Sequence, residues 1–546
     1  MKKRNLFQRV HCLLIGCIAL FSFFQSVTAY CQSKDVVIQV GNRAVINGKK
    51  EISLDTIGRL RSLLLSGEVT FLERNGYFQV ILLDSKGKEY LVYREAGTFY
   101  VPGEKIILNE DAYETTFLDT PYPNKLIISA KGCSFNKGKV HVVLPLQSLQ
   151  RGYQNQPSLA QLKQQSETYK QVIRRKEIDR INHYNEEHKI LWVAGETSFS
   201  RLPYEQRKNA FSTNGDDDLS TYGWEYYSGG ILTPWGVDYD SLIFYETTTA
   251  PYVESFSWSN RHGKDWNTKP RNQMDPLVGG CWAHGPLSAF EAYVNLYRGE
   301  KVDQKFSIQE LLSCSDTHII FNEFGLGGYG TSGATDYIVN TGLMSENDFP
   351  LNANLFTAPN KSEGAVKAYC NSKPSIPQIR YKAGRKINVP AHNGSLKNSH
   401  IDLMDAIMKY GPGSVSVNEL RHVMCIVGWG VIKPGLFMEY WPPYWDPIMV
   451  SKDHPLANKV YWIIKNSCGE GWGYNGYACL VRSISRYEDF YNEDSRRPRG
   501  KIGFDECTFF AGPLKMEVNG IEQNIEKKAF DEDGDGGIWR QTRRRF

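Results

Sequence analysis

Cys281, His422 and Asn466 are the residues of this chain whose types and surroundings could carry out nucleophilic catalysis. Cys281 opens an apolar stretch, His422 begins an apolar run, and Asn466 follows another such run. A thiol attacks as the thiolate, which a helix N-terminus and a nearby imidazolium stabilise. A side-chain amide can fix which ring nitrogen of the imidazole carries the proton. A single Cys or His in an apolar run is more often part of a core, so the prediction depends on the three residues together.

The spacing of apolar residues predicts the elements that hold these side chains. A helix is expected from Cys281 to Gly299, because apolar residues recur in it at steps of three, four and seven. Those residues are Trp282, Leu287, Phe290, Tyr293, Val294 and Tyr297. Cys281 then lies in the first turn, at the positive end of the helix dipole. The apolar runs that start at His422 and end before Asn466 predict two buried strands.

These segments resemble the papain and cathepsin family of cysteine peptidases. In that family the active-site Cys is followed by Trp, as Cys281 is by Trp282. The family's His opens an apolar strand that ends Val-Gly-Tyr-Gly, which is similar to the course of the chain from His422 to residues 427–430. Its Asn lies in Lys-Asn-Ser-Trp-Gly, and Asn466 lies in Lys-Asn-Ser-Cys-Gly.

The same resemblance implies further site residues. Gln273 follows an asparagine, as in the family, which makes its side chain the expected oxyanion donor beside the Cys281 backbone N–H. Gly327 and Gly328 stand where the family has the glycines of its substrate groove, and Trp472 belongs to a matching Gly-Trp-Gly motif. These three residues are therefore expected to bind substrate.

The fold implied by the resemblance is α+β, a two-lobed papain-like peptidase domain over residues 250–515. Its expected activity is hydrolysis of peptide bonds in proteins or peptides. Cys281 would attack the carbonyl and His422 would carry the proton to the leaving amine, while Asn466 orients the imidazole. No metal or organic cofactor is required for this chemistry.

Some residues depart from the family pattern. Val278 stands where the family has a half-cystine, so we expect Cys314 to be a free buried thiol. Cys468 replaces a tryptophan that shields the Asn–His hydrogen bond, so water is expected to compete for that bond. His284 replaces a phenylalanine, and we interpret it as a packing residue.

The segment around His422 departs as well. Only four residues separate the apolar segment 414–417 from His422, where the family usually places a loop and a strand, and a long insert at 431–459 follows instead. This change and Cys468 favour an alternative, a catalytically weak or inactive papain-like scaffold that binds other molecules. An acyl-transfer enzyme such as a transglutaminase is a third hypothesis, but such enzymes normally use an Asp where this chain has Asn466.

The first residues have the pattern of a signal peptide over 1–29. The chain opens with four basic residues, Lys2, Lys3, Arg4 and Arg9. An apolar run at 12–24 and Val-Thr-Ala at 27–29 follow, with cleavage expected after the alanine. Cys31 raises the alternative of a lipid anchor, but Tyr30 is not the small residue that such sites prefer. Export to the periplasm, the cell surface or the medium is therefore expected.

Composition agrees with an exported enzyme. The net charge is +4 and 23% of residues are charged, so no nucleic-acid partner is implied. No stretch after the signal segment is long and apolar enough for a membrane span. Of the 11 cysteines, two lie in the signal segment, so an odd number remains for disulfides and one free thiol.

The rest of the chain divides by pattern. Residues 35–150 alternate short β-branched runs with Gly, Asn, Asp and Pro, which predicts a small all-β domain before the peptidase domain. Residues 160–215 are polar and helical in pattern, and their motif order resembles the inhibitory pro-segment of cathepsin B-like peptidases. A solvated helix or linker is the alternative there.

An acidic and basic tail occupies residues 516–546. Asp531, Asp533 and Asp535 fall at positions 1, 3 and 5 of a calcium loop, with glycine at position 6. Thr542 stands at position 12, where a bidentate Glu is needed, so a weak calcium site and a solvated acidic turn both remain open.

Overall fold

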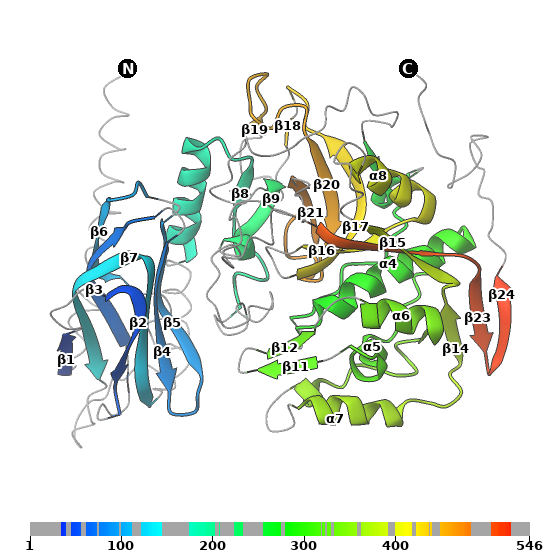
Figure 1. Ribbon diagram of the computed structural model, residues 1–546, viewed down its shortest axis with the longest axis horizontal. Helices are drawn as coiled ribbons and strands as arrows, with labels where there is room; N and C mark the ends of the chain where they lie inside the picture. Colours follow the sequence, from blue (N-terminus) through cyan, green and yellow to red (C-terminus); the bar gives the residue numbers. More distant parts are fainter. Residues whose placement is uncertain are drawn as a thin grey trace, which may run out of the picture. The chain divides into compact units, whose positions relative to one another are not determined.

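The chain divides into two compact units, Met1–Ile173 and Arg174–Phe546. The computed structural model (Figure 1) describes residues 34–39, 45–55, 60, 62–73, 76–97, 100–111, 122–144, 174–202, 207, 223–232, 255–261, 263–274, 279–317, 319–322, 325–328, 332–356, 362–390, 399–417, 422–435, 437–438, 448–481 and 504–525. The predicted signal segment and the aspartates of the predicted calcium loop lie outside these residues.

The first unit is all β in its described residues. Its strands are β1 (Lys34–Gln39), β2 (Val45–Ser53), β3 (Ser62–Phe71), β4 (Tyr77–Asp84), β5 (Glu89–Ala96), β6 (Lys105–Asp111) and β7 (Pro123–Leu144). They form one seven-stranded antiparallel sheet around a core of aliphatic and aromatic side chains. The predicted small all-β domain is thus confirmed.

Strand β7 holds this unit together because it takes part in two sets of pairings. Its first half pairs with β2 and β4, and its second half pairs with β1 and β3. Gly132 lies between the halves at φ 58°, a conformation that glycine adopts without a steric cost. A Cβ on Gly76 would lie 2.7 Å from the Gly132 carbonyl oxygen, so the two backbones approach too closely for a side chain.

The second unit contains a nine-stranded sheet that carries part of the candidate site. The strands are β8 (Trp192–Ala194), β9 (Tyr227–Leu232), β10 (Phe256–Ser257), β15 (Arg385–Pro390), β16 (Gly413–Val417), β17 (His422–Val431), β20 (Val460–Lys465), β21 (Tyr477–Val481) and β22 (Phe504–Ala511). Their order is β15-β22-β16-β17-β20-β21-β9-β8, with β10 paired to β17. The strands predicted from His422 and before Asn466 are β17 and β20.

Besides a helix over residues 174–187, the described residues of this unit contain α4 (Cys281–Arg298), α5 (Ile308–Cys314), α6 (Ser332–Asn340), α7 (Glu363–Ala368) and α8 (Ser399–Tyr410). The predicted helix is confirmed as α4, which ends at Gly299 in the left-handed conformation. Smaller sheets complete the unit: hairpin β11 (Ile319–Asn322) with β12 (Gly325–Gly328), hairpin β18 (Phe437–Met438) with β19 (Ile448–Met449), and the four strands β13 (Leu343–Met344), β14 (Ile379–Lys382), β23 (Leu514–Val518) and β24 (Ile521–Ile525).

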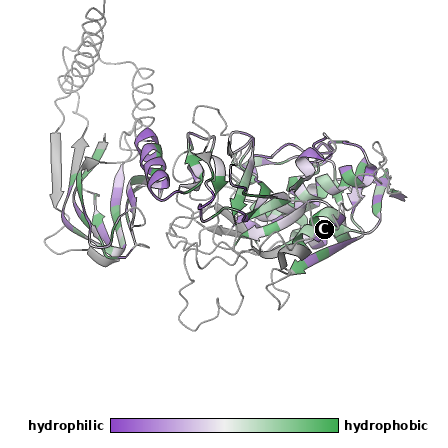
Figure 2. Ribbon diagram, turned by 90° about the horizontal axis from the view of Figure 1, so that it is seen from above, coloured by the Kyte–Doolittle hydropathy of each residue, from purple (hydrophilic) through white to green (hydrophobic). Residues whose placement is uncertain are grey.

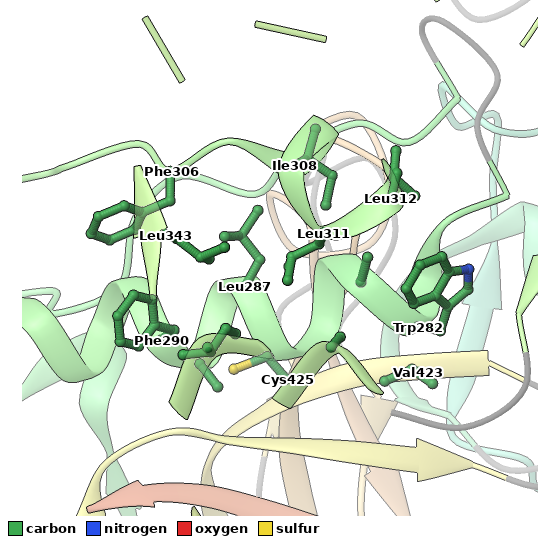
Figure 3. Packing of buried hydrophobic residues seen from close by; sticks show 14 of the residues in the cluster. Trp282, Leu287, Phe290, Phe306, Ile308, Leu311, Leu312, Leu343, Val423 and Cys425 are labelled. Atoms are coloured by element: carbon green, nitrogen blue, oxygen red, sulfur yellow. The ribbon is translucent and has the colours of Figure 1, made fainter. Parts of the chain in front are cut away.

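Helix α4 is the centre of the core of this unit. It is buried along nearly its whole length, which explains why apolar residues occur on more than one of its faces. Leu287 packs toward Leu311 of α5 and Phe290 contacts Phe306, whereas Cys425 of β17 lies on the other side of the helix (Figure 3). The helix therefore connects the helical lobe to the sheet.

The described part of residues 174–232 belongs to this second unit. We call it the arm; it comprises residues 174–202, 207 and 223–232. It begins with a helix over residues 174–187, mainly hydrophilic in Figure 2, and continues through β8 and β9. Strand β8 thus comes from the region 160–215, in which the sequence predicted a pro-segment or linker, and β9 follows that region.

Candidate active site

Cys281 is the first residue of α4 and is 3% exposed. The helix reaches β17 closely because residue 285 is glycine. A Cβ there would lie 2.6 Å from Val423 Cγ1 and 3.1 Å from the Met424 carbonyl oxygen. The Val423 backbone hydrogen-bonds the Cys281 thiol. Since Val423 directly follows His422, this contact brings the predicted nucleophile to the start of the strand that carries the predicted base.

His422 is placed by a tight hairpin. Only residues 418–421 separate β16 from β17, and His422 pairs with Val417 at the closed end of that hairpin. Its Nε2 lies 2.7 Å from Asn466 Oδ1. An amide oxygen only accepts, so Nε2 donates, and Nδ1 is the ring nitrogen that can take a proton. Asn466 Oδ1 also accepts from the Ser467 backbone N–H at 2.8 Å, which holds the amide in this orientation.

Gln273 is held beside these residues by two hydrogen bonds to Ser467. The Gln273 backbone N–H donates to the Ser467 carbonyl oxygen at 2.8 Å. The Ser467 hydroxyl donates to Gln273 Oε1 at 2.7 Å. Since Oε1 is occupied in this way, the amide NH2 of Gln273 is the group that can donate to an oxyanion. Ser467 had not been identified from the sequence.

Burial dominates the protonation of the two reactive side chains. It raises the pKa of Cys281 to about 11, although backbone hydrogen bonds from Val423, Trp282 and Cys281 itself lower it. Burial lowers the pKa of His422 to about 4, against the hydrogen bond to Asn466, which raises it. Between these values both side chains are neutral.

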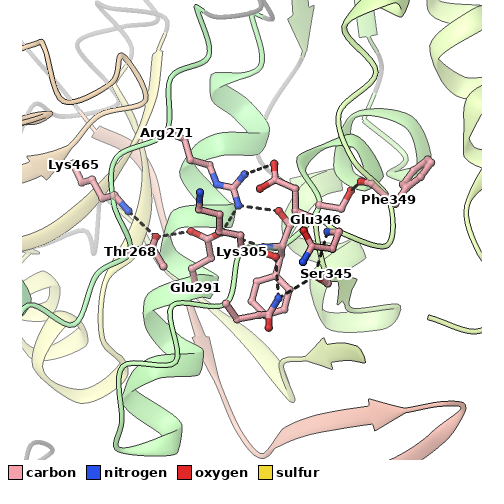
Figure 4. A network of polar contacts seen from close by, with 12 residues as sticks. Thr268, Arg271, Glu291, Lys305, Ser345, Glu346, Phe349 and Lys465 are labelled. Carbon is pink, nitrogen blue, oxygen red and sulfur yellow. Dashed lines mark hydrogen bonds and ion pairs between the residues drawn. The ribbon is translucent and has the colours of Figure 1, made fainter. Parts of the chain in front are cut away.

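A buried polar network links the segments that carry the site (Figure 4). Lys465 Nζ donates to Thr268 Oγ1 at 3.1 Å, and Thr268 Oγ1 donates to Glu291 Oε2 at 2.5 Å. Arg271 pairs with Glu291 at 2.6 Å and with Glu346 at 3.1 Å. Burial alone would lower the pKa of Arg271, but the two carboxylates raise it.

The network has members next to each predicted catalytic group. Lys465 precedes Asn466, Arg271 lies two residues before Gln273, and Glu291 lies on α4 behind Cys281. The sequence offered one sign of this network, an acidic residue at position 291 within a largely apolar helix. A charge in a buried helix needs a partner.

Cys468 does not leave the Asn466–His422 hydrogen bond open to water, contrary to expectation. His422 is 1% exposed, Asn466 2% and Cys468 1%. Burial and the Cys281 thiol raise the pKa of Cys468 to about 12, against a hydrogen bond with the Asn466 side chain. The small side chain is itself covered, because Ser198 of the arm lies over this loop and its hydroxyl donates to the Cys468 carbonyl oxygen at 3.3 Å.

The predicted substrate-binding residues lie on strand β12 and in the loop between β20 and β21. Gly327 and Gly328 lie on β12, paired with Ile320 and Ile319 of β11. Trp472 is 1% exposed, and its indole N–H donates to the Trp224 carbonyl oxygen of the arm at 2.9 Å. Trp472 is therefore covered by the arm in this structure.

The prediction of a free thiol at Cys314 is wrong. Cys314 at the end of α5 forms a disulfide with Cys370, whose Cα lies 5.2 Å away. Cys370 lies in the short 3-10 helix Tyr369–Ser372 that follows α7. The error arose because partners 56 residues apart in sequence are brought together only by the packing of α7 and its 3-10 extension on α5.

His284 lies one turn after Cys281 and is 5% exposed. Burial lowers its pKa to about 3, and electrostatic interactions with Arg271, His422 and Lys465 lower it as well. Its Nδ1 has no hydrogen-bond partner among the described residues. A neutral histidine packed in place of the family's phenylalanine agrees with the interpretation of His284 as a packing residue.

The residues that the structure describes contain no group of three or more His, Cys, Asp or Glu side chains that could hold a metal ion. Among the described helices, none is long and apolar enough to cross a membrane. The aspartates of the predicted calcium loop lie outside the described residues.

Comparisons with known proteins give consistent matches. Residues 252–493 match the family described as papain family cysteine protease. A cysteine protease of Blomia tropicalis is 24% identical over 315 residues, covering 56% of this chain and 82% of that protein. Mexicain of Jacaratia mexicana is 26% identical over 269 residues, covering 48% of this chain and 99% of mexicain.

Solved structures are also similar. Digestive procathepsin L 3 of the Tenebrio molitor larval midgut is 18% identical with a TM-score of 0.36, covering 66% of this chain and 95% of that chain. Bromelain protease from Ananas comosus in complex with the E64 inhibitor is 20% identical with a TM-score of 0.30, covering 47% of this chain and 99% of that chain.

The family match, together with a cysteine at a helix N-terminus beside a His–Asn pair, identifies a cysteine peptidase with an α+β fold. Residues 252–493 are thus the part of the chain that matches the papain family of cysteine proteases. The expected fold class and enzyme class are thereby confirmed.

Proposed function

We propose that the chain is an endopeptidase in which Cys281 attacks the peptide carbonyl and His422 transfers the proton to the leaving amine. The observation that carries this proposal is the 2.7 Å contact between His422 Nε2 and Asn466 Oδ1. This contact leaves Nδ1 of His422 as the ring nitrogen that transfers the proton. The Cys281 thiol lies at the same end of β17, because it hydrogen-bonds the backbone of Val423, the residue after His422. Gln273 and the Cys281 backbone N–H would stabilise the oxyanion.

Substrates would be proteins or peptides with an accessible extended segment. Gly327 and Gly328 support this proposal, since a glycine backbone lets a peptide approach closely. No residue of the proposed reaction needs a metal or organic cofactor.

A labelling experiment tests the proposed function. The purified protein, kept reduced, is treated with a peptide epoxide or vinyl sulfone, and hydrolysis of unfolded casein is followed in parallel. We expect one label, at Cys281, and loss of both label and hydrolysis in Cys281→Ala. Cys425→Ala is the matched control, because Cys425 is also a buried thiol but lies in the core behind α4. Absence of both label and hydrolysis in the unmodified protein would rule out the proposed function.

A second candidate function is a papain-like scaffold that binds without cleaving. The raised pKa of Cys281 and the lowered pKa of His422 favour it, because a neutral pair in the resting state is less reactive than a thiolate–imidazolium pair. Binding of a peptide without label and without hydrolysis would support this second function.

We further propose that the protein is exported, on the pattern of the segment 1–29. Expression in a host with a general secretory route should give a mature chain that begins at Tyr30. N-terminal sequencing of the exported protein checks this cleavage. A lipid-modified Cys31 would instead support the alternative of an anchor.

A further inference from the structure

The arm is part of the catalytic sheet. Strand β9 pairs in parallel with β21, Ile231 opposite Cys479 and Leu232 opposite Leu480. All six residues of β9 are buried, and β8 pairs with its other edge. A strand buried on both faces and paired on both edges has no exposed side along which it could leave easily.

The arm also shares a hydrophobic core with the insert that follows His422. Leu191 and Ile231 of the arm pack with apolar residues of the peptidase region, namely Ile432, Val450, Leu456 and Val481. His454 of the insert adds a polar contact, because its Nε2 lies 2.7 Å from the Lys189 carbonyl oxygen and its Nδ1 accepts from the Leu456 backbone N–H at 3.1 Å. The insert at 431–459 thus provides part of the surface against which the arm packs.

The third contact involves the loop between β20 and β21. Trp472 donates to the Trp224 carbonyl oxygen at 2.9 Å, and its ring lies 5.1 Å from that of Tyr227. The Gly230 backbone N–H donates to the Tyr474 hydroxyl at 2.7 Å. A Cβ on Gly473 would lie 2.9 Å from the Tyr227 ring, so the fit needs glycine there.

The same loop connects the arm to the active site. The Ser198 backbone N–H donates to the Gly471 carbonyl oxygen at 2.9 Å, and the Ser198 hydroxyl contacts Cys468. Cys468 lies two residues after Asn466 and interacts with its side chain. The arm therefore supports the backbone that holds the orienting amide.

We propose that the arm is a permanent structural component of the peptidase unit, and that Trp472 anchors the arm instead of contacting substrate. If the chain is cut between β9 and β10, the arm stays bound as a separate polypeptide. Its departure would expose Tyr227, Ile231 and Trp472 to water and leave β21 with an unpaired edge. The consequence for activity rests on the proposed function, whereas the retention of the arm does not.

The test uses the full chain with a recognition sequence for a site-specific protease between residues 233 and 254. The cut is made in Cys281→Ala, to prevent self-digestion, and the product is passed over a size-exclusion column without denaturant. We expect both fragments to elute together and to separate only in urea. Elution of the two fragments apart would overturn the proposal.

Labelling of Cys281 in the cut active chain separates this proposal from the proposed function. Retention of the arm with unchanged labelling supports both the permanent arm and the proposed function. Release of the arm with a severalfold rise in labelling overturns the permanent arm, supports an inhibitory pro-segment and leaves the proposed function standing. Retention of the arm without any labelling, cut or uncut, supports the arm and overturns the proposed function.

A substitution tests the role of Trp472. In Trp472→Phe the indole N–H that binds Trp224 is lost, so the arm of the cut protein should dissociate at a lower urea concentration than in the parent. Trp266→Phe is the matched control, because its buried indole N–H also donates to a backbone oxygen, that of Arg261, which lies outside the arm. Equal urea midpoints in the parent and in Trp472→Phe would overturn the anchoring role.

Discussion

Ser467 orients the side-chain amides of Gln273 and Asn466. Its hydroxyl donates to Gln273 Oε1 and its backbone N–H donates to Asn466 Oδ1. Each bond determines which end of an amide faces the reacting groups. The orientation of both amides therefore depends on a residue that does not itself react.

Ser467→Ala is expected to lower kcat about tenfold with a smaller change in KM. The Gln273 amide then loses the bond that orients it, but it remains present, so the effect should be smaller than the loss of about 10²–10³ typical when an oxyanion donor is removed. Steady-state kinetics on a peptide substrate, with Gln273→Ala for comparison, measure this effect.

Ser313→Ala is the matched control for that prediction. The buried Ser313 hydroxyl accepts from Gln309 Nε2 at 2.6 Å within α5, so its removal also breaks a serine–glutamine hydrogen bond, but away from the site. Equal kcat values for Ser467→Ala and Ser313→Ala would show that Ser467 does not position Gln273.

At the scale of elements, the disulfide between Cys314 and Cys370 joins α5 to the 3-10 helix after α7. Cys370→Ser is expected to lower the free energy of unfolding by about 2–4 kcal/mol, because the bridge restricts a long loop in the unfolded chain. Urea unfolding under non-reducing conditions measures the loss. The same substitution in fully reduced protein should have little effect, and an equal loss there would indicate packing, not the bridge, as the cause.

The polar network gives a second prediction at this scale. Glu291→Gln is expected to destabilise the unit by about 3–5 kcal/mol, because Arg271 and Lys465 then remain buried without their central carboxylate. It should also lower kcat, since Gln273 and Asn466 adjoin these residues. Glu300→Gln is the control, because it breaks a partly exposed pair with Arg298, the last residue of α4. A loss of stability no larger than the control's would contradict a supporting role for the network.

The elements that could be predicted are those with a local signal. Helix α4 follows from the spacing of its apolar residues and from Gly299, and β17 and β20 follow from unbroken apolar runs. The Cys–His–Asn candidates stood at the ends of these elements. Their positions in the fold could therefore be predicted together with the elements.

The contacts that the sequence did not predict are those made between distant segments. The partner of Cys314 depends on how α7 and its 3-10 extension pack on α5, and the role of Ser467 depends on its pairing with Gln273, 194 residues away. Strand β8 lies in the region 160–215, whose polar residues indicate a helix or linker, and β9 follows that region. Their burial depends on partners that lie after residue 430.

At the scale of the whole molecule, three histidines are buried in a neutral state within the second unit. Burial lowers the pKa of His284 to about 3 and that of His422 to about 4, and it also lowers the pKa of His454. A histidine whose pKa is lowered in the folded state leaves the stability of the fold undiminished at a pH above its pKa in the unfolded chain, which is about 6.5. That stability is lost as the pH falls from about 6.5 toward the folded pKa, because the unfolded chain then binds more protons.

The free energy of unfolding of the second unit should therefore decrease as the pH falls, and His284→Phe should make this decrease less steep. Between pH 6 and 4 each such histidine contributes a slope of up to about 1.4 kcal/mol per pH unit, so the variant should lose about that much of the slope. The free energy of unfolding of the variant should also be about 1–3 kcal/mol higher at neutral pH, because Nδ1 of His284 has no partner among the described residues.

Tryptophan fluorescence during urea unfolding follows this unit alone, since all 12 tryptophans lie after residue 190. His183→Phe, which replaces an exposed histidine of the arm, should leave the slope unchanged, and an equal slope in parent and His284→Phe would show that His284 does not contribute.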